Sequence, residues 1–239
     1  MWWALWRTLL MPDFTNRDPR TPGFWDQRFE AEFMPWDRGG VPVQLSAWLQ
    51  TGKPVSDPQG QTLDQRQSRA EVSDPAGQTS GCRFSVLIPG CGSGYELQAF
   101  CEAGWNATAI DFSPSAVVAA QQAVGPWREH VIEADFFAYD PPQPLDLVYE
   151  RAFLCAMPRD MWPRVVQCWA QLLPEGGLLL GYFFFDDNPK GPPFGAGREQ
   201  LAQLMGAHFD LEHDEPASDS IPVFQGKERW MAWRRKKAL

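Results

Sequence analysis

The sequence is poor in the residues that build metal centres and nucleic-acid surfaces. It has three histidines, and its five cysteines (Cys82, Cys91, Cys101, Cys155 and Cys168) form no C-x-x-C pair. A zinc site or an iron–sulfur cluster therefore lacks a ligand set, and no metal is expected. An odd number of cysteines without framework spacing is typical of a reducing compartment and predicts a cytoplasmic protein. The net charge of −9 disfavours nucleic acid as a partner.

Long apolar runs are also missing. No stretch reaches the ~20 apolar residues of a membrane span, so no membrane partner is expected. Residues 1–7 are apolar but short, and Arg7 interrupts them. Residues 1–10 are either a packed N-terminal helix or a segment upstream of the true initiator, for which Met11 is the candidate.

The segment 51–81 has few apolar side chains. Only five of its residues are apolar, among many Gln, Ser, Asp, Gly and Pro. Such a segment buries too little surface to offset its ordering entropy, which predicts a flexible insertion. The 239 residues suit one α/β domain. We expect it to span 24–239 after an N-terminal extension at 1–23.

The rest of the chain alternates between strand and helix patterns. Helical segments are expected within 24–50, with a break at 35–40 and a short helix at 43–49. Further helices are expected at 95–103, 114–123 (with Ser113 as N-cap), 161–173 and 198–205, and strands at 84–88, 107–112, 131–132, 145–149, 178–185 and near 209–211 and 230–233. This order predicts a Rossmann-like, doubly wound α/β fold with a mostly parallel seven-stranded sheet covered by helices on both faces. Ligands bind such sheets at the carboxyl ends of the strands.

A glycine loop follows the first of these strands and opens a helix. It reads Gly90-Cys91-Gly92-Ser93-Gly94, and its glycines let the backbone turn tightly and approach a ligand closely. A dinucleotide-binding loop would place glycine at position 95, but Tyr95 stands there and crowds the helix terminus where a pyrophosphate would rest. The spacing favours an adenosyl ligand without phosphates, with a purely structural turn as the alternative.

Two acidic residues at strand ends support this interpretation. Asp111 closes the second strand, where its carboxylate can accept hydrogen bonds from both ribose hydroxyls. Asp135, in Asp135-Phe136-Phe137 at the end of the third strand, can accept a hydrogen bond from the adenine amino group while an aromatic side chain covers the ring. Solvated strand ends are the alternative for both. Because Asp111 and Asp135 follow the glycine loop at successive strand ends, the three features together favour ligand binding.

These segments, in this order, resemble the thiopurine methyltransferase family and, more closely, its plant-type halide/thiol methyltransferase branch. The resemblance covers about 24–50 and 83–235 and leaves out 51–81. Its segments are 24–30, 35–37, 86–94, 134–137, 153–157, 191–194 and 226–228. It implies the class I methyltransferase fold, S-adenosyl-L-methionine as the cofactor with S-adenosyl-L-homocysteine as its product, and a small-molecule acceptor; we expect a monomer.

Carried over position by position, the resemblance implies cofactor contacts for nine residues, with Gly92 included as part of the glycine loop. They are Trp25, Phe29, Trp36, Gly90, Gly92, Asp111, Asp135, Phe136 and Arg151. Phe29 stands where plant-type members usually have tryptophan, so a ring remains and an indole N–H is lost. Arg151 is typical of thiopurine-type members, whereas the halide branch often has an aromatic residue there. This departure puts halide as acceptor in doubt.

Arg151 is the one residue expected to act on the nucleophile. A thiol attacks as a thiolate, and an arginine beside the methyl group would favour that anion. No histidine lies in a matching motif to serve as a base. The sequence therefore predicts methyl transfer to a small thiol or related sulfur anion.

Several alternatives stay open at this point. For Arg151, the alternative to a role in catalysis is a structural salt bridge with Glu150 or Asp146. For the aromatic residues Trp25, Phe29 and Trp36, the alternative to cofactor contact is ordinary hydrophobic packing onto the sheet. For the whole chain, the alternatives are a halide or small-molecule O-methyltransferase, a non-catalytic cofactor-binding module and an NAD-dependent oxidoreductase.

Overall fold

The structure is a computed structural model and describes residues 12–51 and 84–237. The expectations for residues 1–10, and for the 51–81 segment beyond Thr51, lie outside the described residues. The elements follow in the order α1 (Pro22–Glu30), α2 (Val43–Gln50), β1 (Ser85–Pro89), α4 (Tyr95–Glu102), β2 (Asn106–Asp111), α5 (Pro114–Ala123), η1 (Gly125–His130), β3 (Val131–Glu133), β4 (Leu147–Arg151), η2 (Leu154–Ala156), η3 (Arg159–Met161), α6 (Trp162–Leu172), β5 (Leu178–Phe184), α7 (Arg198–Gly206), β6 (Phe209–Pro216) and β7 (Glu228–Arg235).

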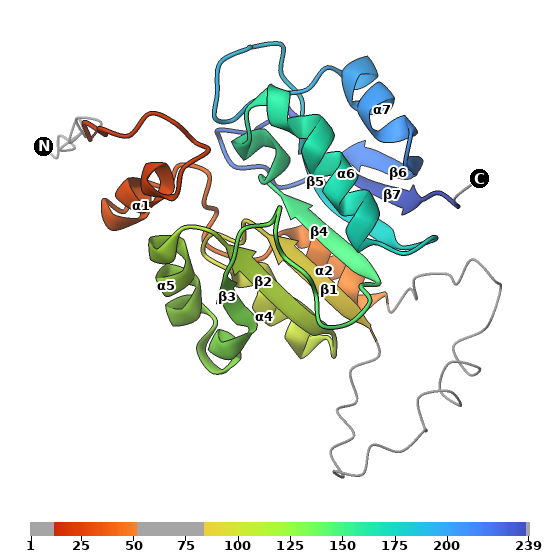
Figure 1. Cartoon of the computed structure of the whole chain (residues 1–239), viewed down its shortest axis with the longest axis horizontal. Helices are drawn as coiled ribbons and strands as arrows, with labels where there is room; N and C mark the ends of the chain where they lie inside the picture. Colours follow the sequence, from red (N-terminus) through yellow and green to blue (C-terminus); the bar gives the residue numbers. More distant parts are fainter. Residues whose placement is uncertain (1–11, 52–83, 238–239) are drawn as a thin grey trace, which may run out of the picture.

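The strands form one seven-stranded sheet in the order β3-β2-β1-β4-β5-β7-β6 (Figure 1). Strands β1 to β5 pair in parallel, and β7 runs antiparallel to both β5 and β6. Since β1 lies between β2 and β4, the chain leaves β1 toward one edge of the sheet and later continues toward the other. This reversal opens a crevice at the carboxyl ends of the strands. The predicted fold class is confirmed.

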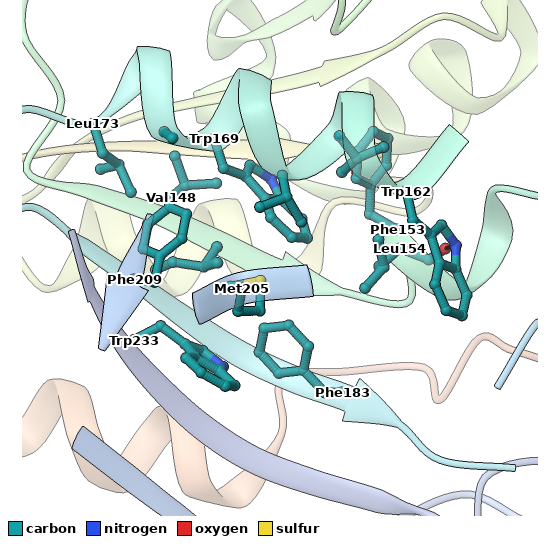
Figure 2. Close-up of a cluster of buried hydrophobic side chains, with 14 of the residues drawn as sticks. Val148, Phe153, Leu154, Trp162, Trp169, Leu173, Phe183, Met205, Phe209 and Trp233 are labelled. Atoms are coloured by element: carbon teal, nitrogen blue, oxygen red, sulfur yellow. Dashed lines mark hydrogen bonds between the residues drawn. The ribbon is translucent and has the colours of Figure 1, made fainter. Parts of the chain in front are cut away.

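Alternate residues of the central strands enter two cores on opposite faces of the sheet, as the period of two in a strand requires. In β1, Val86 and Ile88 pack with Phe100 of α4, whereas Leu87 lies in the core that Trp169 of α6 occupies. Figure 2 shows the second core, in which Trp169 lies on one side of a cluster that also holds Phe183 of β5.

Most element boundaries agree with the sequence prediction, and helix α5 begins and ends where expected. The Ser113 hydroxyl caps α5 by accepting a hydrogen bond from the Ala116 N–H at 3.2 Å. Strand β4 starts two residues later than predicted, at Leu147, and ends at Arg151. Strand β6 is much longer than the predicted 209–211, because it is an edge strand whose exposed polar residues give no apolar pattern. No helix in the described ranges is long and apolar enough to cross a membrane.

Gly181 lies where β5 passes closest to β4. It pairs with Glu150, and a Cβ atom at position 181 would lie 1.8 Å from the Glu150 carbonyl oxygen. We expect Gly181→Ala to lower the free energy of unfolding by ~3 kcal/mol, because neither backbone can move aside within the sheet. Urea denaturation measures this loss. Gly206→Ala is the control, since nothing lies within 4 Å of a Cβ there; equal effects of the two substitutions would contradict the prediction.

Glu150 is a buried acid whose Oε1 accepts a hydrogen bond from the Leu154 N–H at 2.8 Å, while Oε2 has no partner among the described residues. Burial raises the pKa of Glu150 to about 8, although the Leu154 N–H acts in the opposite direction. The folded protein therefore binds a proton more tightly than the unfolded chain, and stability falls as the pH rises from about 4.5 toward 8.

We expect Glu150→Gln to remove this part of the pH dependence, because glutamine keeps the acceptor for Leu154 and cannot ionise. Urea denaturation at pH 5.5 and pH 8 measures it. The wild type should lose more stability between the two values than the variant, by roughly 1 kcal/mol or more. Glu199→Gln, at an exposed position of α7, should behave as the wild type. Parallel pH profiles for wild type and Glu150→Gln would refute the assignment.

Candidate active site

A cavity of about 770 Å³ lies at the carboxyl ends of β1, β2 and β4. Its volume falls in the range of sites for small molecules and cofactors. All nine residues that the sequence predicts for ligand contact line it: Trp25, Phe29, Trp36, Gly90, Gly92, Asp111, Asp135, Phe136 and Arg151. The fold therefore brings together positions that lie as far apart as the first helix and the fourth strand.

The glycine loop, residues 90–94, forms the floor of this cavity between β1 and α4. Gly90 has a φ of +58°, and a Cβ atom there would lie 2.5 Å from the Phe153 ring. Any larger residue would have to displace that ring and adopt a strained backbone. The packing of Phe153 therefore requires glycine at position 90, and residues of the loop line the cavity.

Asp111 connects the glycine loop to the start of α5 by hydrogen bonds. Its Oδ2 accepts a hydrogen bond from the Gly92 N–H at 3.0 Å, and its Oδ1 accepts one from the Ser113 N–H at 3.0 Å. Burial raises the pKa of Asp111 to about 6, although both N–H groups act in the opposite direction. Each carboxylate oxygen keeps a second lone pair, so the group can still accept hydrogen bonds from a ligand.

Asp135 and Phe136 lie just after β3, which ends at Glu133. The Asp135 carboxylate accepts a hydrogen bond from the Phe137 N–H at 2.9 Å. Phe136 is buried and packs edge-to-face on Phe153, with ring centroids 4.8 Å apart. Its ring thus belongs to the core as well as to the cavity wall.

Three rings from the N-terminal part of the described chain form an aromatic cap (Trp25, Phe29 and Trp36) on the cavity. Trp25 and Trp36 meet edge-to-face at 5.4 Å, and Phe29 meets Trp36 at 6.3 Å. Phe29 also comes close to the glycine loop, because a Cβ atom at Gly92 would lie 3.7 Å from its ring. The cap therefore lies directly beside the floor of the cavity.

Polar contacts hold the cap in place. On α1, which Figure 1 shows near α5, Asp26 accepts hydrogen bonds from the Ser113 hydroxyl and from the Ser115 N–H. Asp37, just after the cap, accepts a hydrogen bond from the Ser93 hydroxyl of the glycine loop. The residues before α1 are held separately, because the exposed Arg20 forms an ion pair with Asp160 of η3. Its Nη2 lies 2.8 and 2.9 Å from the two carboxylate oxygens of Asp160.

Arg151 ends β4 at the cavity and faces a buried acid that the sequence analysis missed. Its Nε lies 3.6 Å from Oε1 of Glu96, in the first turn of α4, and both side chains are about 90% buried. The ion-pair partner is thus neither Glu150 nor Asp146. The guanidinium also lies over the Tyr182 ring, 4.8 Å from its centroid. Burial raises the pKa of Glu96, while Arg151 acts in the opposite direction.

The remaining side of the cavity is an apolar wall that the sequence analysis did not identify. It comes from η2, η3 and two loops and consists of Cys155, Met157, Met161, Pro192, Pro193 and Val223. None of the three histidines of the sequence lines the cavity. Within the described ranges, no group of three or more His, Cys, Asp or Glu side chains is placed to hold a metal ion. The resemblance marked 153–157 and 191–194 without giving these residues a role.

The comparison with known sequences points to one family. The model of the family described as Thiopurine S-methyltransferase (TPMT) matches residues 74–236. Thiocyanate methyltransferase 1 of Arabidopsis thaliana is 25% identical over 219 residues, which cover 89% of this chain and 85% of the relative. Thiopurine S-methyltransferase of Aliivibrio salmonicida is 28% identical over 165 residues, which cover 61% of this chain and 78% of the relative.

Solved structures share the fold. The 1,6-didemethyltoxoflavin-N1-methyltransferase of Burkholderia thailandensis, with bound S-adenosylhomocysteine, superposes with a TM-score of 0.63 at 18% identity, covering 95% of this chain and 94% of that one. The magnesium protoporphyrin IX methyltransferase of Synechocystis, with bound SAM, gives 0.62 at 15% identity, covering 93% and 99%. Because the family model spans well over half of the sequence, the chain belongs to the thiopurine S-methyltransferase family.

Proposed function

We propose that this protein transfers the methyl group of S-adenosylmethionine to a small thiol or a related sulfur anion. One observation carries the proposal: a single cavity joins an adenosyl-type site, made by the glycine loop, Asp111 and Asp135, to an apolar wall without a histidine. The names of the relatives support it, since one acts on thiocyanate and the other on thiopurines.

The residues at the strand ends fit the cofactor in the order of the sheet. Asp135, after β3, would accept a hydrogen bond from the adenine amino group. Asp111, at the end of β2, would accept from the ribose hydroxyls with its free lone pairs. Gly90 and Gly92 line the cavity and carry no side chain of their own, so a ligand could lie close to their backbone.

The cofactor supplies an activated methyl group on a sulfonium. The protein has to hold the acceptor sulfur, the methyl carbon and the leaving sulfur in line, and such positioning contributes ~7–11 kcal/mol. The aromatic cap would exclude water and favour the sulfonium charge by cation–π contact, which is worth ~2 kcal/mol when desolvated. As the new carbon–sulfur bond forms, the bond to the sulfonium breaks, and the anionic acceptor becomes a neutral thioether.

The apolar wall favours a soft nucleophile that is already anionic. A neutral hydroxyl or amine would need a base to take its proton, and no histidine lines the cavity. Arg151, at the opposite side from the nucleoside, would favour an anion, but Glu96 beside it offsets part of that charge. Thiolates of low pKa and thiocyanate fit these conditions best.

Asp111 provides a test of the cofactor site. We expect Asp111→Asn to weaken binding of S-adenosylhomocysteine roughly tenfold or more at pH 7.5, because a hydrogen bond to a charged acceptor is lost. In the wild type, affinity should fall as the pH drops below about 6, where Asp111 takes up a proton. Isothermal titration calorimetry between pH 5 and pH 8 measures both effects. Asp140→Asn, at an exposed site, is the control, and unchanged affinity in Asp111→Asn would exclude the ribose contact.

A panel of acceptors tests the reaction itself. We expect transfer of a labelled methyl group to aryl thiols and to thiocyanate, with much slower transfer to catechols, because the cavity offers no histidine as base. Iodide in the same assay separates halide methylation from thiol methylation. Tight cofactor binding without transfer to any of these acceptors would instead support a non-catalytic binding module, and preferential methylation of catechols would support an O-methyltransferase.

A further inference from the structure

The segment 186–195 lies between β5 and α7 and brings Pro192 and Pro193 to the apolar wall of the cavity. Three of its ten residues are prolines, which have no backbone N–H to donate. An isolated bridge between Phe185 and Ala196 closes its base. Because the segment forms no hydrogen-bonded ladder of its own, its path across the cavity depends on contacts with other elements.

Arg159, the first residue of η3, holds both ends of this segment. Its Nη2 donates hydrogen bonds to the carbonyl oxygens of Asp186, at 3.3 Å, and Asn188, at 3.1 Å, and also to that of Gly195. Within the part of the chain that the structure describes, no carboxylate forms an ion pair with Arg159. The guanidinium therefore directs its charge at backbone carbonyls, and one nitrogen joins the start of the segment to its end.

These hydrogen bonds connect two sides of the apolar wall. One side, from η2, η3 and the turn between them, includes Met157 and Met161, and the other side consists of Pro192 and Pro193. Arg159 lies between the two methionines in the sequence, but it does not line the cavity itself. The separation of the two sides thus depends on a side chain that stands outside the cavity.

Two other contacts attach the segment at single points. The Phe194 N–H donates to the Cys155 carbonyl oxygen at 2.7 Å, and the Asp186 carboxylate forms an ion pair of 2.6 Å with Lys227. The Lys227 side chain is half-exposed, and such an ion pair contributes at most ~1 kcal/mol. Neither contact joins the two ends of the segment, as the guanidinium of Arg159 does.

We propose that Arg159 is a positioning residue for the methyl acceptor. By holding the segment 186–195 against η3, it sets the space that an acceptor can occupy between the prolines and the methionines of the wall. This inference rests on the proposed function and adds to it a determinant of acceptor size. The ring of an aryl thiol is large enough to contact both sides of the wall, whereas thiocyanate is a small linear anion that does not need both. Aryl thiols therefore depend on Arg159 much more than thiocyanate does.

Steady-state kinetics of Arg159→Met with thiophenol and with thiocyanate test this proposal. We expect KM for thiophenol to rise roughly tenfold or more with little change in kcat, because the ring loses contact with one side of the wall, and KM for thiocyanate to change less than about twofold. The affinity for S-adenosylhomocysteine should stay the same, since Arg159 does not line the cavity. Arg128→Met, which removes an exposed arginine of η1, is the matched control and should leave all these values unchanged.

Arg159→Lys covers the case in which Arg159→Met does not fold. It keeps the positive charge but lacks the planar guanidinium, so KM for thiophenol should rise in the same way by a smaller factor. In a folded variant, equal losses with thiophenol and thiocyanate, or an unchanged KM for thiophenol, would overturn the inference and leave the proposed function standing. A wild type that methylates neither acceptor would refute the proposed function, and the inference with it.

Discussion

The carboxylate of Asp111 connects three parts of the molecule that approach one another from different directions. It accepts a hydrogen bond from the Gly92 N–H of the glycine loop and another from the Ser113 N–H at the start of α5. The Ser113 hydroxyl in turn donates to Asp26 of α1, which carries the aromatic cap. The floor and the cap of the cavity are thus fixed to the end of β2 by one short chain of hydrogen bonds, and the shape of the cavity depends on it.

Much of the fold could be predicted because the parallel strands are buried on both faces and appear as short apolar runs. The sequence did not show the full length of β6, since its exposed residues at the sheet edge carry no apolar alternation. Helix α5 was the easiest element, because Ser113 and Pro114 mark its start by a cap and a preset φ. Prediction was thus accurate where local chemistry decides structure, and poor where the position in the sheet decides it.

The same distinction holds for the cavity. Gly90, Asp111 and Arg151 could be placed together from the sequence, because parallel strands end at one edge of the sheet. The partner of Arg151 could not be foreseen, since Glu96 reaches it through the way α4 packs on the sheet, where Phe100 of α4 lies against Tyr149 of β4. The apolar wall was also missed, because residues such as Pro192 and Val223 reach the cavity from loops whose paths depend on the whole fold.

Helix α1 and the residues before it are attached to the rest of the molecule by two contacts of different kinds. On the sheet side, Asp26 joins it to α5 through partly buried hydrogen bonds, whereas the residues before it are joined to η3 by the exposed pair of Arg20 and Asp160. An exposed ion pair contributes at most ~1 kcal/mol and weakens in salt. Of the two attachments, the one at η3 is therefore the weaker and the more sensitive to salt, so the cap is held chiefly from the side of α5.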